Sequence, residues 1–260
     1  MTAYVRDTAL LTARSLRALP RVPERLLDVT VQPIVFIVLF LYVFGAAIHV
    51  PGISYEDYMI PGIIGQSLAF GIIGAGVATS NDMNEGVIDR FRSLPISRLS
   101  VISAQVMGQF CEQILGMVIV VGLGLALGWT PHLTLVHGLE LVGLVALGMF
   151  AFTWAGVLFG MIVRSPDAMQ GVGFIVVFPL AFMAGTFVPI SKMDAVPRAI
   201  AHWDPISALV ASVRNLAQGT HATGSWQLTH PELAMALWCL LVVAVCVPLA
   251  LRRFNRKLAM

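Results

Sequence analysis

The chain has 260 residues, of which 58% are hydrophobic and only 12% are charged, and its mean hydropathy is +0.85. This composition excludes a soluble globular protein and predicts an all-α integral membrane protein with a single membrane domain over residues 1–260. The net charge of +2 is too small to indicate binding to nucleic acid.

The first predicted element is an amphipathic helix within residues 1–28 that lies in the membrane interface. Its apolar stripe consists of Val5, Ala9, Thr12, Leu16 and Leu19. A second stripe holds the arginines Arg6, Arg14, Arg17 and Arg21. In such a helix the apolar face enters the headgroup boundary, while the arginines meet anionic lipid or a protein partner.

Six apolar segments of at least 18 residues follow and predict six membrane-spanning helices. They cover residues 31–48, 58–78, 101–127, 139–162, 168–188 and 233–251. Pro179 predicts a kink in the fifth segment, because proline removes one backbone donor. Two glycine pairs, Gly124 with Gly128 and Gly156 with Gly160, have GxxxG spacing, which is weak evidence for a face that meets a second copy of the chain.

A charged segment at residues 82–98, between the second and third spans, predicts a short helix that Pro95 ends. Its apolar face consists of Val87, Ile88, Phe91 and Leu94. The other face holds Glu85, Asp89, Arg90, Arg92 and Ser93. One face of this helix can therefore lie on the membrane surface, while the other can meet a partner.

Residues 189–231, between the fifth and sixth spans, contain two short helical patterns at 195–203 and 206–216. Neither is long enough to span a membrane, so each is expected to re-enter the membrane or to lie on its surface. Thirteen of the sixteen basic residues lie in the amino terminus, the charged segment, the turn at Arg164 and the carboxyl tail. The positive-inside rule therefore predicts cytoplasmic termini and an extracellular segment 189–231.

Polar residues inside the predicted spans mark a candidate path for a transported molecule. Gln66 lies in the second span, and one face of the third carries Gln105, Gln109, Glu112 and Gln113. Glu112 lies about 11 residues into its span, roughly 16 Å at the helical rise, and so near the bilayer centre. A carboxyl there is costly and faces the bundle interior, a cavity or a partner helix. Interhelical hydrogen bonding is the alternative to a role in a substrate path.

The sequence contains no catalytic or metal-binding motif. It lacks HExxH, GxSxG and, inside the predicted spans, paired carboxylates at helical spacing, and its three cysteines have no zinc spacing. A Walker A loop is excluded because neither lysine, Lys192 or Lys257, follows a glycine. The chain is therefore predicted to be no enzyme and to carry no metal or cofactor of its own.

With these elements, the chain resembles the type-2 ABC transporter permeases, in particular the daunorubicin-resistance branch. Two stretches carry the resemblance, residues 85–98, similar to the coupling segment of that family, and residues 164–207. Asp204 stands where the family commonly has Asn, a change that keeps the helix break. The importer-type coupling loop is not reproduced, since Gly86 and Leu94 lie too close together, and this favours export.

The resemblance implies a type V exporter-like fold with outer helices that re-enter the membrane, in a bacterial plasma membrane. Two permease copies, expected to be identical, would pair with two copies of a separate ATPase subunit that binds ATP and Mg²⁺. The residues expected to contact that ATPase are Glu85, Val87, Ile88, Asp89, Phe91, Arg92 and Leu94. The expected cargo is a hydrophobic drug, polyketide or lipid-like molecule.

Two other classes of function compete with this interpretation. An ion-coupled secondary transporter would use Glu112 as its proton site, but the chain shows no inverted repeat and no other charged residue expected to be buried in the membrane. A membrane-embedded enzyme would need a catalytic set that the sequence lacks.

Overall fold

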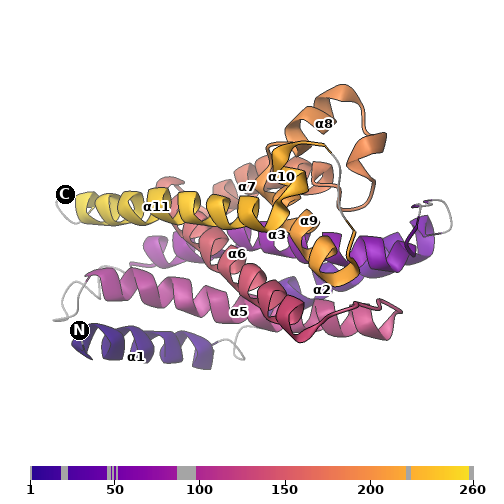
Figure 1. The fold of residues 1–260 in the computed structure, drawn as a ribbon. Coiled ribbons are helices and arrows are strands. Elements are labelled where there is room, and N and C mark those ends of the chain that lie inside the picture. The colour runs from indigo at the N-terminus through magenta and orange to yellow at the C-terminus, as the bar shows by residue number, and fades with distance from the viewer. Residues whose placement is uncertain are drawn as a thin grey trace.

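The computed structural model describes residues 2–18, 23–45, 48, 50, 52–86, 98–220 and 224–257, and all regular elements in these ranges are helical (Figure 1). The long elements are α1 (Thr2–Ala18), α2 (Pro23–Leu39), α3 (Tyr55–Asn84), α5 (Arg98–Ala126), α6 (Leu135–Ile162), α7 (Pro166–Met183) and α11 (Pro231–Lys257). The short ones are the π-helix η2 (Phe40–Phe44), the 3-10 helix η3 (Ile190–Lys192), α8 (Ala195–Ala201), α9 (Pro205–Gln218) and α10 (Trp226–Thr229).

Within the described ranges, five helices are long and apolar enough to cross a membrane. They are Tyr55–Asn84, Leu99–Ala126, Leu135–Ile162, Pro166–Met183 and Pro231–Phe254. The predicted first span, residues 31–48, overlaps an apolar stretch of 14 residues, Thr30–Val43, and the helix ends at Phe44, before the predicted end of the span. Five spans are thus supported by the structure, and the sixth stays a prediction.

The predicted charged helix at residues 82–98 starts differently in the structure. Residues 82–84 are the last turn of α3, because no glycine or proline lies between Gly76 and Gly86, and Gly86 has a φ of +65°. Glu85 follows as the C-cap of α3, and α5 begins at Arg98. The predicted helix between them, including Val87, Ile88, Asp89, Phe91, Arg92 and Leu94, lies outside the described residues.

Glycines bring α3 and α6 into close contact. A Cβ added at Gly156 would clash with the carbonyl oxygen of Ile72, and one added at Gly160 would clash with that of Gly76. Small residues allow such approach between membrane helices, where the lipid gives no hydrophobic drive for association. The prediction that this pair faces a second copy is therefore wrong, because it packs inside the chain.

Helix α9 belongs to the core of the bundle, although it is too short to span a membrane. It packs against α3, α6 and α11, and Leu209 and Val210 on it are fully buried. Its Gln218 side chain donates a hydrogen bond of 2.9 Å to Asp57 at the start of α3, and Asn215 donates one of 2.6 Å to Glu232 of α11. The predicted short pattern at residues 206–216 therefore forms a buried helix that holds α3 and α11 together at one end of the bundle.

Asp204 begins α9 as a buried N-cap. Its carboxylate accepts hydrogen bonds from the backbone N–H groups of Ile206 and Ser207, at 3.1 and 3.2 Å. Burial nevertheless raises the pKa of Asp204 from 3.8 to about 6, because the charged form loses solvation and these hydrogen bonds only partly compensate. The folded state therefore holds the Asp204 proton more tightly than the unfolded state does.

The raised pKa of Asp204 predicts that stability falls as pH rises from about 4 to about 6, by roughly 1–3 kcal/mol. In that window the unfolded chain loses the proton first, so deprotonation favours unfolding. Asp204→Asn should remove this pH dependence and keep the cap, whereas Asp204→Ala should lose the cap at a cost of about 1 kcal/mol. Thermal unfolding from pH 4 to 7 measures the stability of the wild type and of both variants. An Asn variant with the same pH dependence of stability as the wild type would contradict the assignment of this dependence to Asp204.

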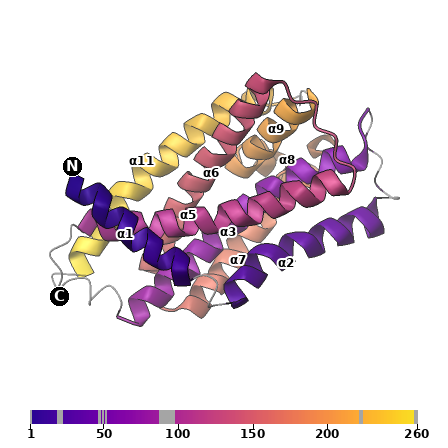
Figure 2. The same cartoon turned by 90° about the horizontal axis from the view of Figure 1, so that it is seen from below.

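Helix α1 lies along α5 at the end of the bundle where both termini are found (Figures 1 and 2). The hydroxyl groups of Tyr4 and Ser103 form a hydrogen bond of 2.8 Å between the two helices. Most of the predicted apolar stripe, including Val5 and Leu16, stays exposed, and so do Arg6, Arg14 and Arg17. The predicted interfacial faces are therefore available, while the contact with α5 uses a third face.

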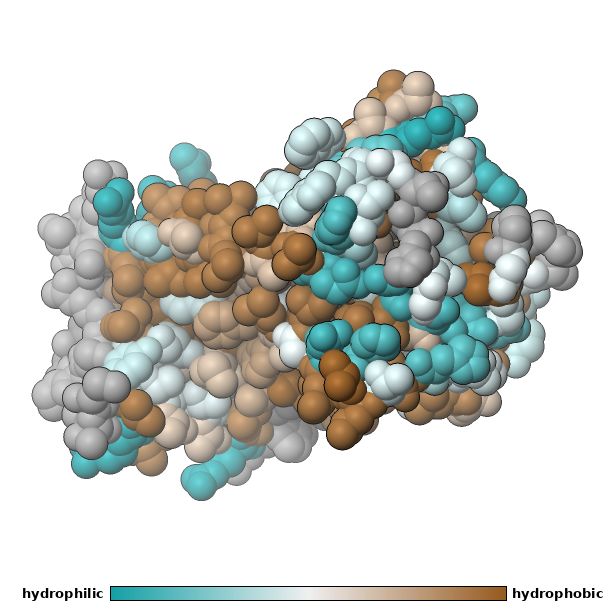
Figure 3. All heavy atoms as spheres, viewed as in Figure 1, coloured by the Kyte–Doolittle hydropathy of each residue, from teal (hydrophilic) through white to brown (hydrophobic). Residues whose placement is uncertain are grey.

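The surface separates into an apolar and a polar region. Apolar side chains cover the visible face along α11 and α6, whereas polar ones gather over the end that carries α8 to α10 (Figure 3). The large exposed apolar residues of α11 are Leu233, Leu237, Leu240, Leu241, Val245 and Leu249. Such a band is what contact with lipid requires.

Candidate functional site

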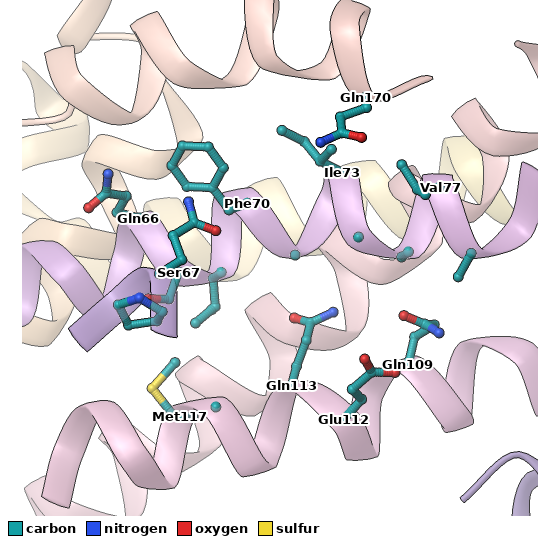
Figure 4. Close-up of a pocket in the computed structure, with 18 of the residues that line it drawn as sticks. Gln66, Ser67, Phe70, Ile73, Val77, Gln109, Glu112, Gln113, Met117 and Gln170 are labelled. Atoms are coloured by element: carbon teal, nitrogen blue, oxygen red, sulfur yellow. The ribbon is translucent and has the colours of Figure 1, made fainter. Parts of the chain in front are cut away.

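A cavity of about 500 Å³ lies between α2, α3, α5 and α7 (Figure 4). Its polar lining consists of Gln32, Gln66, Ser67, Asn81, Gln109, Glu112, Gln113 and Gln170. Three phenylalanines, Phe36, Phe70 and Phe174, also line it. A cavity of this size can enclose one small organic molecule, and the mixed lining suits an amphipathic one.

The helical repeat builds the two main walls. On α3 the lining positions Ser67, Gly71, Gly74, Ala78 and Asn81 are spaced three and four residues apart. On α5 the corresponding set is Gln109, Glu112, Gln113 and Gly116. Residues at this spacing share one face of a helix, so the polar faces of α3 and α5 meet across the cavity.

The structure brings together four of the five side chains predicted to line a substrate path. Gln66, Gln109, Glu112 and Gln113 all line the cavity, whereas Gln105 does not. Gln105 shares their face of α5, but it lies four residues, or about 6 Å, further toward the amino-terminal end of the helix. The predicted stripe thus extends beyond the cavity at that end.

The prediction missed three amides that the structure adds to this lining, Gln32, Asn81 and Gln170. Gln32 and Gln170 are single polar residues in predicted spans, so the rule that singled out the amides of α5 could have found them. Asn81 lies beyond the predicted end of the second span, and no signal in the sequence linked it to the others.

Gln113 connects three helices at the cavity wall. Its Nε2 donates a hydrogen bond of 2.8 Å to Oγ1 of Thr153 on α6, and that hydroxyl donates one of 2.7 Å to the carbonyl of Met149. Because the hydroxyl proton of Thr153 is already used, Gln113 must be the donor, which fixes the orientation of its amide. The amide also lies against Gly71 of α3, where a Cβ would be 2.6 Å from Oε1.

Two buried amide atoms in these walls have no hydrogen-bond partner among the described residues, Nε2 of Gln66 and Oε1 of Gln113. Gln66 is only 2% exposed. An unpaired polar group in a protein interior costs about 1–3 kcal/mol, so unused hydrogen-bonding capacity beside a cavity favours a polar ligand.

Glu112 is the one ionisable residue among those that line the cavity. Its side chain is 8% exposed, and Figure 4 shows it on α5 between Gln109 and Gln113. A carboxyl so placed faces a cavity, as expected for a carboxyl inside a membrane span. The described residues hold no group of three or more His, Cys, Asp or Glu side chains that could bind a metal ion.

Seven phenylalanines, half of the fourteen in the chain, form one cluster next to the cavity. They are Phe36, Phe40, Phe70, Phe174, Phe178, Phe182 and Phe187. Ring centroids along the series Phe174, Phe178 and Phe182 are 5.5 and 4.3 Å apart. The cluster joins α2, α3 and α7 and forms an apolar wall of the cavity.

Of the seven residues predicted to contact an ATPase, the structure describes only Glu85. It is exposed and directly follows α3, one turn beyond Asn81 of the cavity lining. Glu85 thus lies at the end of the single 30-residue helix that forms this cavity wall.

Comparison with known proteins agrees with the resemblance. The family described as ABC-2 type transporter matches residues 6–217. A daunorubicin resistance ABC transporter permease protein, DrrB1, from Streptomyces coeruleorubidus is 29% identical over 246 residues, which cover 94% of this chain and 84% of the relative. A doxorubicin resistance ABC transporter permease protein, DrrB, from two strains of Mycobacterium tuberculosis is 27% identical over 237 residues, which cover 84% of this chain and 78% of the relative.

Proposed function

Because this chain belongs to the ABC-2 type transporter family, we propose that it is the membrane-spanning subunit of an ATP-driven exporter. The observation that carries the proposal is the cavity, which places six amides and one carboxyl among apolar helices. Polar side chains at such positions are costly and mark pathways for transported molecules. Membership of this family favours ATP as the energy source over an ion gradient through Glu112.

The cargo we propose is a hydrophobic drug, polyketide or lipid-like molecule that also carries polar groups. Phe36, Phe70 and Phe174 offer apolar and aromatic contact, while the amides offer hydrogen bonds. The relatives from Streptomyces and Mycobacterium are described as resistance permeases for daunorubicin and doxorubicin, which supports a hydrophobic drug.

The proposed assembly contains two copies of this chain in the bacterial plasma membrane and two ATPase subunits, which bind ATP and Mg²⁺. Residues 85–98 and both termini lie in the cytoplasm, and the segment carries Glu85 and Arg92 to the ATPase. Movement of the bound ATPase would shift α3 and α5, whose polar faces form the cavity walls. A rigid lever with different contacts in two states is what such coupling requires.

Affinity purification from the native membrane tests the coupling. We expect an ATPase chain to co-purify and the complex to hydrolyse ATP in response to cargo. Arg92→Glu should lower this response roughly tenfold, because a reversed charge repels the partner surface. Arg253→Glu is the matched control, since it makes the same charge change in α11, and it should leave the response unchanged. The proposal fails if no ATPase co-purifies, or if the Arg92 variant responds as the wild type does.

A further inference from the structure

The α3 wall of the cavity carries no side chain at Gly74, although the neighbouring Ile73 and Val77 also line it. Ser67, Gly71, Gly74, Ala78 and Asn81 repeat along the cavity face of the helix, and Gly74 is the middle residue of this series. At Gly74, therefore, α3 contributes only backbone to the cavity wall.

Gly74 differs from the glycines that serve close packing. A Cβ added at Gly71 would lie 2.6 Å from the Gln113 amide, and one at Gly173 would lie 2.9 Å from Ile73. A Cβ added at Gly74 would meet no heavy atom within 4 Å. Helix packing in the chain thus does not require glycine at this position, and a side chain there would enter the open space of the cavity.

Glycine at the centre of a helix also has a cost. It is less favourable than alanine by about 0.8–1.0 kcal/mol, and neither packing nor a positive φ demands it at Gly74. A requirement for space in the cavity explains the residue, because every other amino acid would reduce the volume that a ligand can occupy.

We propose that Gly74 sets the size of the cargo by leaving its own position in the α3 wall without a side chain. The cargo is then a bulky molecule that fills the cavity of about 500 Å³, and a larger residue at this position admits only narrower molecules. The inference rests on the proposed function, because it assigns the cavity to a transported molecule.

Two neutral probes with the same hydroxyl group test this inference, naphthalene-2-methanol and the larger pyrene-1-methanol. Binding is measured by equilibrium dialysis against the purified chain in lipid nanodiscs, with empty nanodiscs as background. The wild type should bind both probes above background. Gly74→Leu should weaken binding of the pyrene probe about tenfold or more, through overpacking, and that of the naphthalene probe by less than about threefold. Gly74→Ala and Gly74→Val should give intermediate losses in order of size.

Gly122→Leu is the matched control. A Cβ at Gly122 also meets no heavy atom within 4 Å, but this residue of α5 does not line the cavity. Both leucine variants gain helix propensity, so a melting temperature equal to or above that of the wild type confirms that each is folded.

Three results for the wild type and Gly74→Leu would overturn the inference. They are a Gly74→Leu protein that binds the pyrene probe as the wild type does, an equal loss of both probes in this variant, and no binding of the pyrene probe by the wild type. An equal effect of Gly122→Leu would assign the change to the lipid-facing surface and would also contradict it. No ATP is present, so a missing ATPase leaves this result intact, and the two proposals fail in distinguishable ways.

Discussion

Replacing Arg214 with Met is expected to destabilise the chain by about 2–4 kcal/mol, because this side chain joins α9 to α3 and to the loop after α7. Its Nη2 donates hydrogen bonds of 2.9 and 3.1 Å to the carbonyls of Tyr58 and Gly185. The guanidinium also lies over the Tyr58 ring, with Cζ 3.7 Å from the centroid. Methionine keeps the apolar stem but leaves both carbonyls without this donor.

Thermal unfolding in detergent measures the effect of Arg214→Met. Arg214→Lys should recover only part of the loss, since an ammonium keeps the charge but cannot lie flat on the ring and reach both carbonyls. Arg253→Met removes an exposed arginine and should change stability by less than about 0.5 kcal/mol. Equal melting temperatures for Arg214→Met and the wild type would show that this contact contributes nothing.

Replacing Glu112 with Gln is expected to weaken binding of a cationic cargo about tenfold or more, while a neutral one changes by less than about threefold. The reason is that Glu112 is the one residue of the lining able to carry charge. Protonated 1-pyrenemethylamine and pyrene-1-methanol form a suitable pair of probes, which dialysis against nanodiscs can compare. Gln105→Leu is the control, because Gln105 lies on the same face of α5 outside the cavity, and it should leave both affinities unchanged.

Equal losses for the two probes would refute a charge-specific role of Glu112. A second measurement separates the energy sources, with the chain and its ATPase in sealed vesicles. Cargo should accumulate with ATP and without a pH gradient. Accumulation driven by a pH gradient alone, and lost in Glu112→Gln, would instead support an ion-coupled carrier.

The sequence predicted the parts of the fold that depend on local pattern. Apolar length found the five long spans, and the spacing of Gln109, Glu112 and Gln113 placed their side chains on one face. Neither inference needed to know which helices are neighbours. The same holds for the two short helical patterns at 195–203 and 206–216, which correspond to α8 and α9.

Features that depend on the choice of neighbour could not be predicted in this way. GxxxG spacing shows that a helix has a smooth face, but it does not tell whether that face meets α3 or a second chain, as Gly156 illustrates. The burial of α9 depends on space left between α3, α6 and α11, which no local pattern encodes. The sequence did not indicate that Thr153 accepts a hydrogen bond from Gln113, because a single hydroxyl in an apolar helix usually bonds to the backbone of its own helix.

The phenylalanine cluster beside the cavity has a consequence for how this part of the molecule can deform. None of its seven side chains carries a donor or an acceptor, so moving one ring past another breaks no hydrogen bond and strands no polar atom. Only dispersion contacts are exchanged, and each of these is worth a fraction of a kcal/mol. The apolar wall of the cavity can therefore adapt to molecules of different shape at little energetic cost. The opposite wall keeps its shape, because the hydrogen bond from Gln113 to Thr153 holds its amide in place.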